Sequence, residues 1–321
     1  MVYGLYTIDV EPDNVWANAA STGIENLKSL PLIQSLCNEY GVRPTYLVTY
    51  SLITSPPAMK ILEHLLASGG CEMAAHSHCW EIPPMAASDP YKSLVAAQYS
   101  SSVLEDKLAT LTGVARRAFG QVSSHRAGRW GLDLRQASIL RQLKYTVDSS
   151  VTPGLDWSST GAPDYTGAPG KPYRISESLT SCSPEGVLEV PCTVRPAPRL
   201  FGLERTRIGS GILRRAGFGP RWLRCQPAMT EAQLIATCAW ATSQFPQLNL
   251  MTHSSELHPG TSPMWPSDEA VKRHLHMSTG VFQWWRSRGV IPVTLSEFAA
   301  CWDGRPAISG GSPPGANDAD T

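Results

Sequence analysis

The sequence predicts an α/β fold, a distorted (β/α)7-8 barrel, and three features support this. Short apolar and β-branched runs alternate with longer segments whose apolar residues recur at helical spacing, as in parallel sheets with helices outside. Polar clusters follow several predicted strands, as at the carboxyl-terminal face of a barrel. No Gly-rich phosphate loop follows the first strand, which disfavours a doubly wound open sheet, the alternative architecture.

Local patterns place each element in chain order. Apolar and β-branched runs predict strands at 3–9, 44–50, 70–76, 121–126, 145–148, 188–194, 247–252 and 290–294. Apolar residues at helical spacing predict helices at 24–40, 57–68, 90–112, 132–142, 230–244, 267–287 and from Ser296 onward. Residues 149–184 are rich in Ser, Gly, Pro and Thr without periodicity, which predicts one long surface loop.

The length of 321 residues allows one large domain or two, and the barrel pattern favours one. We predict a single barrel domain over 1–305, with an Arg-rich insertion at about 196–225. Residues 306–321 are mostly Gly, Pro, Ser and Asp without an apolar anchor, which predicts a disordered tail.

Composition and charge narrow the class of protein. A formal net charge of zero and a pI near 7.1 give no global charge that would favour nucleic acid. No apolar run approaches the ~20 residues of a transmembrane helix, and no signal peptide is visible. Eight scattered cysteines without a C-x-x-C pair predict free thiols in a reducing compartment. We therefore expect a cytoplasmic protein without an integral membrane segment.

Two pairs of potential metal ligands stand at the ends of predicted strands. His76 and His78 are two residues apart, and residues i and i+2 of a strand share a face, so both imidazoles could chelate one ion. Asp9 and Glu11 have the same spacing at the end of the first strand. Either pair alone is also common on exposed strand ends. Together, two carboxylates and two imidazoles predict a metallohydrolase site.

Three further strand ends carry polar residues. Arg126, Asp148 and His253 each follow or end a predicted strand, so a barrel would bring them to the same face. A surface ion pair is the alternative for Arg126, and a turn before Ser149 is the alternative for Asp148.

The order of these motifs resembles that of the NodB-type polysaccharide deacetylases, carbohydrate esterase family 4. In chain order, the five motifs of that family resemble residues 7–11, 72–76, 126–128, 145–150 and 251–253 of this sequence. The resemblance spans roughly residues 3–300. It implies a distorted barrel that holds one divalent metal ion, usually zinc, and hydrolyses an N-acetyl group on a sugar.

The resemblance also implies a role for each site residue. Glu11, His76 and His78 would be the metal ligands, and Asp9 the catalytic base, although the two carboxylates could exchange roles. The arginine of the third motif, Arg126, would hold the base.

For the fourth and fifth motifs, the resemblance implies His253 as the catalytic acid, and we expect Asp148 to support the site. The sequence departs from the family pattern in two places. The family spaces its metal histidines four apart, but residue 80 is tryptophan, and Val10 separates the two acidic residues of the first motif.

Aromatic residues on the loops after strands could stack against a sugar. We assign Trp80, Trp130 and the fifth-motif Met251 to substrate binding, with burial as loop anchors the alternative for the tryptophans. His274 and His276 lie two apart on a predicted helix and are expected to be solvated. His125 points to the strand face opposite Arg126 and is not assigned to the site.

The predicted insertion at 196–225 carries seven arginines against one acid, Glu204, interleaved with apolar residues. It could be a lid, bind an anionic glycan, or lie on a membrane surface where lipid-linked glycans are assembled. A solvated cover is the alternative.

The sequence thus predicts a metal-dependent N-deacetylase of a sugar or glycan intermediate. Amide hydrolysis on a non-sugar substrate and a metal-free glycan-binding protein are the alternatives.

Overall fold

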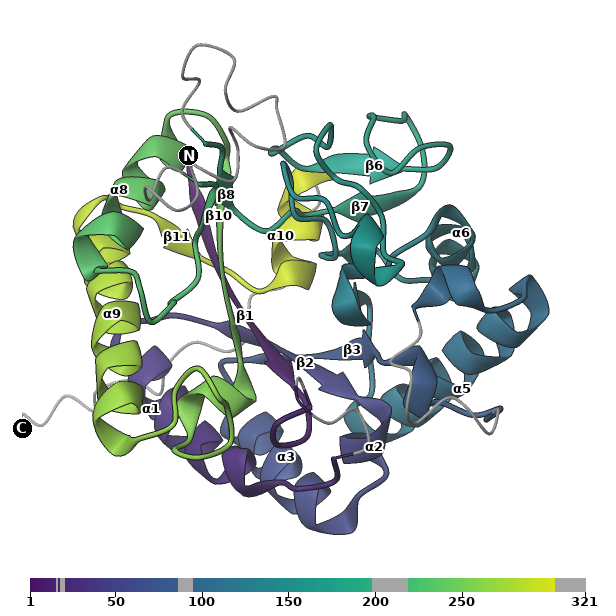
Figure 1. Cartoon of the computed structure of the whole chain (residues 1–321), viewed down its shortest axis with the longest axis horizontal. Coiled ribbons are helices and arrows are strands. Elements are labelled where there is room, and N and C mark those ends of the chain that lie inside the picture. The colour runs from purple at the N-terminus through teal and green to yellow at the C-terminus, as the bar shows by residue number, and fades with distance from the viewer. Residues whose placement is uncertain (16, 18–20, 86–94, 198–218, 304–321) are drawn as a thin grey trace, which may run out of the picture.

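The computed structural model describes residues 1–15, 17, 21–85, 95–197 and 219–303. Its main feature is one strongly curled sheet with the strand order β10-β1-β2-β3-β4-β5-β7-β6 (Figure 1). All neighbouring pairs along this path are parallel except β6–β7. The strands are β10 (Gln247–His253), β1 (Tyr3–Val10), β2 (Pro44–Thr49), β3 (Glu72–Ser77), β4 (Ser124–Ala127), β5 (Val147–Asp148), β7 (Val187–Glu189) and β6 (Tyr173–Ile175). The predicted distorted barrel is confirmed.

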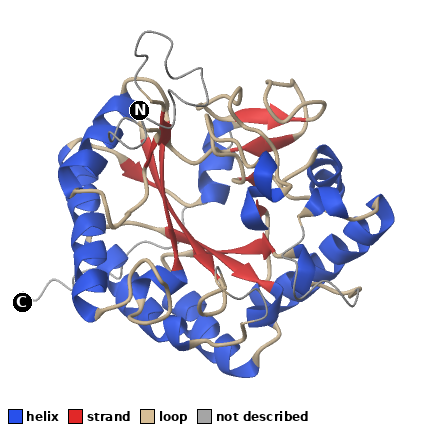
Figure 2. Cartoon of the chain, in the orientation of Figure 1, coloured by secondary structure: helices blue, strands red, loops and turns tan. Residues whose placement is uncertain are grey.

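Helices cover the outer face of this sheet (Figure 2). They are α1 (Leu30–Glu39), α2 (Tyr50–Ile53), α3 (Pro56–Ser68), α5 (Ser101–Phe119), α6 (Leu134–Gln142), α8 (Glu231–Thr242) and α9 (Asp268–Ser287). A last helix, α10 (Leu295–Trp302), follows β11 (Ile291–Pro292), which pairs with the start of β1. Within the described residues, no helix is both long and apolar enough to cross a membrane.

Alternation along the strands separates an outer core from a barrel interior. On β1, Ile8 packs into the large cluster beneath the helices, whereas Leu5 packs in a smaller cluster with Val147 of β5 and Phe298 of α10. This smaller cluster fills the interior near the amino ends of the strands. The interior at the carboxyl ends is therefore left for the polar residues Thr7 and Asp9, which share a face with Leu5.

A two-stranded hairpin bridges the gap between the ends of the curled sheet. It consists of β8 (Val194–Arg195) and β9 (Arg221–Trp222). Thr193 Oγ1 accepts a hydrogen bond from Asn249 N of β10 at 2.8 Å, and Leu223 O accepts one from Met251 N at 3.2 Å. Most of the predicted insertion, residues 198–218, lies outside the described residues, as does the whole predicted tail, 306–321.

Two predictions about elements are wrong. Of the helix expected at 90–112, residues 90–94 lie outside the described residues, and α5 begins only at Ser101. This helix continues through Gly113 to Phe119 and ends at Gly120, where φ is +79°. The stretch 149–184 is more than a surface loop: it contains β6, and Tyr165 and Tyr173 are buried.

The prediction that His274 is solvated is also wrong. This side chain is fully buried on α9, and its Nε2 lies 3.0 Å from Thr252 Oγ1 of β10. None of the eight cysteines, all of which lie among the described residues, forms a disulfide.

Candidate metal centre

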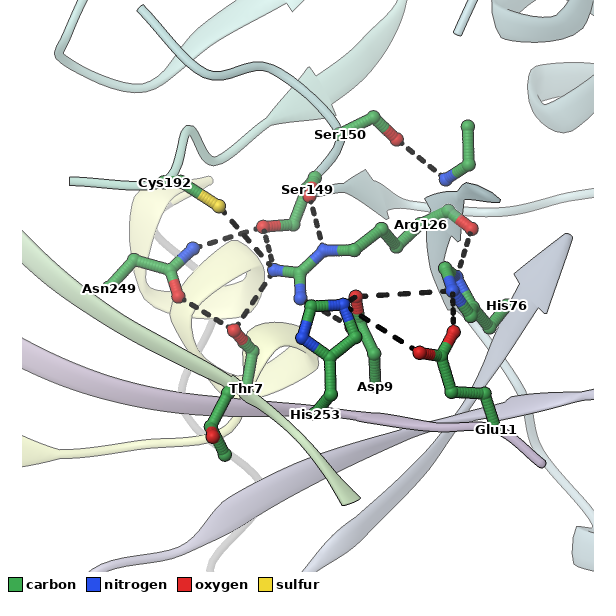
Figure 3. Close-up of polar contacts among 12 residues, drawn as sticks. Thr7, Asp9, Glu11, His76, Arg126, Ser149, Ser150, Cys192, Asn249 and His253 are labelled. Atoms are coloured by element: carbon green, nitrogen blue, oxygen red, sulfur yellow. Dashed lines mark hydrogen bonds and ion pairs between the residues drawn. The ribbon is translucent and has the colours of Figure 1, made fainter. Parts of the chain in front are cut away.

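The carboxyl ends of four strands bring the predicted site residues into one interior cluster (Figure 3). The register places Asp9 of β1 beside His253 of β10, and His76 of β3 beside Arg126 of β4. All four side chains are buried, with at most 2% of their surface exposed. Because the strands are parallel and start at the same end of the barrel, these polar residues share one level above the apolar interior.

Glu11, His76 and His78 form a compact group of potential metal ligands. One donor atom from each lies within 4.8 Å of the others. Glu11 Oε2 is 3.1 Å from His78 Nε2 and 3.9 Å from His76 Nε2. His76 Nδ1 lies 3.0 Å from the carbonyl oxygen of Arg126, which can only accept, so Nδ1 carries the hydrogen and Nε2 presents its lone pair.

The chemistry of this group fits a divalent cation. Among the described residues, the buried atoms Glu11 Oε1 and His78 Nδ1 have no hydrogen-bond partner. Burial lowers the pKa of His76 to about 4 and that of His78 to about 3, so both imidazoles are neutral near pH 7, as ligation requires. Burial also raises the pKa of Glu11, although the charge of Arg129 opposes this shift. Three protein ligands leave a coordination position open for water or substrate.

Trp80 and Gly128 position the ring of His78. The Trp80 indole stacks on the imidazole with ring centroids 4.2 Å apart and an angle of 22° between the planes. A Cβ atom on Gly128 would lie 2.6 Å from His78 Cδ2 and 2.9 Å from Ser77 O. Trp80 is only 1% exposed and packs against His78, a candidate metal ligand, so burial leaves its ring little surface for the sugar contact that the sequence suggested.

Arg126 holds Asp9 from inside the barrel. Its Nη1 donates to Asp9 Oδ1 at 2.6 Å, Nη2 donates to Thr7 Oγ1 at 2.9 Å, and Nε donates to Ser149 O at 2.6 Å. Burial alone would raise the pKa of Asp9, but the charge and hydrogen bond of Arg126 act together with the neighbouring histidines His76 and His253 and lower the pKa below the usual range. Asp9 is therefore ionised, and its Oδ2 faces His76 and His253 at 3.9 and 3.6 Å.

His253 contacts a charged pair that sequence reasoning missed. Arg224 Nη2 lies 3.1 Å from His253 Nδ1 and donates to Glu256 Oε1 at 2.6 Å. A guanidinium only donates hydrogen bonds, so with Nδ1 accepting, the imidazole hydrogen is on Nε2, toward Asp9. Glu256 belongs to a run of polar residues that follows β10, which is a signal the sequence contains. No feature of the sequence distinguishes Arg224 from the six other arginines in the predicted insertion.

Asp148 does not join this cluster. Its neighbour Val147 packs in the interior, so Asp148 faces the opposite side of the sheet, where its Oδ1 lies 2.6 Å from His125 Nδ1. The structure thus places Asp148 outside the interior group, and the expectation that it supports the site stays a prediction. Because β5 has only two residues, the sequence pattern did not fix which of them points inward.

A small pocket of about 10 Å³ opens onto the candidate ligands, roughly the space of one water molecule. It is lined by Asp9, Glu11, Val15, His76, His78, Ala127, Arg129, Trp130 and His253. Trp130, predicted to bind substrate, lies at this pocket, whereas Met251 does not line it and is 2% exposed. Arg129, which the sequence analysis did not single out, has φ of +56°, an uncommon backbone conformation outside glycine.

Comparison with known proteins identifies the fold. Neither a protein-family model nor a curated protein sequence matches the chain. A solved structure from Parabacteroides distasonis, described as a candidate glycoside hydrolase/deacetylase, matches with a TM-score of 0.60 and 12% identity, covering 94% of this chain and 71% of that one. A candidate polysaccharide deacetylase from Mycobacterium smegmatis matches with a TM-score of 0.51 and 12% identity, covering 97% and 94%.

A carbohydrate esterase family 4 pseudoenzyme from Bacillus anthracis is also similar, with a TM-score of 0.46 and 10% identity, covering 92% of this chain and 65% of that one. The chain thus has the distorted barrel fold of the NodB-type polysaccharide deacetylases, and the resemblance seen in its motifs is confirmed at the level of the fold.

Replacing Gly128 with alanine tests whether the packing of His78 sets metal affinity. The new methyl group would overlap His78 and the Ser77 carbonyl, so the imidazole must move. We expect zinc affinity, measured by chelator competition, to fall about 10-fold or more, and the free energy of unfolding to fall by about 1–3 kcal/mol. Gly167→Ala is the matched control, because its Cβ would meet nothing within 4 Å. Equal zinc affinity in both variants would contradict this role.

The buried His274 predicts a pH dependence of stability. Burial lowers its pKa to about 4, against about 6.5 in an unfolded chain. Between these two pH values the unfolded state binds more protons at this residue than the folded state does. The free energy of unfolding therefore falls as pH decreases from 6.5 to 4. In urea titrations of metal-free protein, His274→Asn should show a shallower fall than wild type. His276→Asn is the control, since that side chain is 78% exposed; parallel curves for all three proteins would refute the argument.

Proposed function

We propose that this protein is a metal-dependent hydrolase that removes an N-acetyl group from a sugar or glycan intermediate. The observation that carries the proposal is the convergence of three metal-type donors, Glu11, His76 and His78, beside a separately held carboxylate, Asp9. A metal site with an open position next to an ionised base is the arrangement that amide hydrolysis requires. The shared fold with deacetylase-type structures supports the same class of reaction.

The protein residues have separate tasks in this proposal. Glu11, His76 and His78 would hold a divalent ion, with zinc our proposal for its identity. Such an ion polarises an acyl carbonyl and lowers the pKa of a bound water toward ~7.

Asp9 would take the proton of the attacking water through Oδ2. Its other oxygen, Oδ1, is occupied by Arg126, which also keeps the carboxylate ionised and fixed in direction. Oδ2 faces the histidines, so it is the oxygen in position to act.

His253 would deliver a proton to the leaving nitrogen. To act as the acid, His253 would be doubly protonated, with its Nδ1 hydrogen toward Glu256 Oε2, 3.7 Å away, in place of the Arg224 contact. It would give its Nε2 hydrogen to the leaving nitrogen and then take up the proton that Asp9 Oδ2, 3.6 Å away, had removed from the water. Arg224 and Glu256 hold the ring from the other side. Trp130 forms part of the pocket wall where the acyl group would bind.

The remaining parts of the proposal concern substrate and location. We propose a glycan substrate, in an anionic or lipid-linked form, because the predicted insertion is rich in arginine. We place the reaction in the cytoplasm, where eight cysteines that form no disulfide would stay reduced.

Acetate release from N-acetylglucosamine oligomers and from nucleotide-linked N-acetylglucosamine tests the function with zinc-loaded protein. We expect turnover of one of these probes, and a fall in kcat of about 10²–10⁴-fold in Asp9→Asn with zinc retained. Glu25→Gln is the control, because Glu25 is an exposed carboxylate with a 58% exposed side chain.

Unchanged kcat in Asp9→Asn would rule out Asp9 as the base. Cleavage of small cyclic amides without acetate release would favour the non-sugar amidase instead.

A further inference from the structure

A second polar cluster lies on the opposite face of the same strands. Ser77 of β3, His125 of β4 and Asp148 of β5 form a continuous chain: Ser77 Oγ is 2.9 Å from His125 Nε2, and His125 Nδ1 is 2.6 Å from Asp148 Oδ1. Gln136 of α6 donates to Ser77 Oγ at 2.9 Å, and Ser150 N donates to Asp148 Oδ2 at 3.0 Å. This chain of contacts therefore crosses three neighbouring strands and is anchored at both ends.

The order serine, histidine, carboxylate matches that of a hydrolase triad, but this cluster has no access to a substrate. Ser77 is 2% exposed, and His125 and Asp148 are 0% exposed. None of the three lines the pocket at the candidate ligands. A nucleophilic serine needs room for an acyl group at its hydroxyl, so another role has to explain these buried hydrogen bonds.

The position of Ser77 in the chain suggests that role. Ser77 stands between His76 and His78, and side chains alternate along a strand, so fixing Ser77 on the outer face directs both imidazoles inward. Ser77 lies at the very end of β3, and His78 is already outside it. The backbone pairing between β3 and β4 thus ends just before His78, the second candidate histidine. Beyond that point, side-chain contacts have to hold the segment in place.

The electrostatics of the cluster are consistent with a rigid support. Burial alone would raise the pKa of Asp148, but its hydrogen bond and charge interaction with His125, together with hydrogen bonds from Glu189 and Ser150, lower it. Asp148 is therefore held ionised against His125. A buried charge with short hydrogen bonds resists rotation of its partners, because each alternative leaves a polar group unpaired.

We propose that Ser77, His125 and Asp148 are positioning residues for the metal centre: they hold the segment 76–78 so that His76 and His78 face Glu11 together. This inference rests on the proposed function only in requiring that the centre binds a metal ion. In this proposal Asp148 acts through His125 and Ser77 and does not contact the reacting atoms.

Cobalt binding to the full-length protein tests the inference, since affinity and the visible absorption bands of Co²⁺ both report ligand geometry. We expect Ser77→Ala and Asp148→Asn to raise the Co²⁺ dissociation constant about 10-fold or more and to change the bands. Thr237→Val is the matched control: Thr237 is equally buried, and its hydroxyl donates to Gln233 O on α8. This variant should bind Co²⁺ as wild type does, even if its Tm falls as much.

The outcomes separate the two claims. Wild-type binding in Ser77→Ala and Asp148→Asn overturns the positioning role and leaves the proposed function standing. Failure of the wild-type protein to bind Co²⁺ or Zn²⁺ overturns both. If Ser77→Ala does not fold, Asp148→Asn alone decides, because it keeps the size of the side chain. Equal losses of affinity in these variants and in Thr237→Val would also overturn the inference, since the effect would then follow from general destabilisation.

Discussion

The buried ion pair between Arg126 and Asp9 is the interaction on which the rest of the site depends. Arg126 is 0% exposed, so its charge is tolerated only because Asp9, Thr7 and Ser149 satisfy it. Removing one partner of such a pair costs about 3–5 kcal/mol, because the other charge stays buried. The carbonyl oxygen of the same arginine fixes the hydrogen of His76 on Nδ1, so one residue orients both Asp9 and the candidate metal ligand His76.

The two faces of the sheet divide the work. Alternation sends Asp9, His76, Arg126 and His253 into the interior, while the intervening residues form buried hydrogen bonds beneath the helices. The smaller apolar cluster, which includes Phe298 of α10, fills the interior near the amino ends of the strands. The polar residues therefore lie at the carboxyl ends, where the small pocket is located. The geometry of the strands thus places the candidate site residues on one face of the sheet and their supporting hydrogen bonds on the other.

Sequence patterns could predict the interior cluster because it depends on spacing within single strands. The i, i+2 pairs Asp9/Glu11 and His76/His78 share a face in any strand, and the structure groups them. Sequence patterns could not predict contacts between segments that are distant in the chain. Arg224, near the end of the predicted insertion, contacts His253 29 residues further along the chain. Whether Asp148 points inward depended on the phase of a two-residue strand. The sequence analysis grouped Trp80 with the loop aromatics that could bind a sugar, because no sequence pattern predicts that its ring stacks on His78.

The central claim is that Glu11, His76 and His78 together hold one divalent ion. Anomalous diffraction at the zinc edge, on crystals grown with zinc, tests it most directly. The account predicts one peak within about 2.0–2.2 Å of Glu11 and of a nitrogen of each histidine, with Asp9 still bonded to Arg126. A peak coordinated by Asp9 in place of Glu11, or full zinc occupancy elsewhere with none at these three residues, would contradict it.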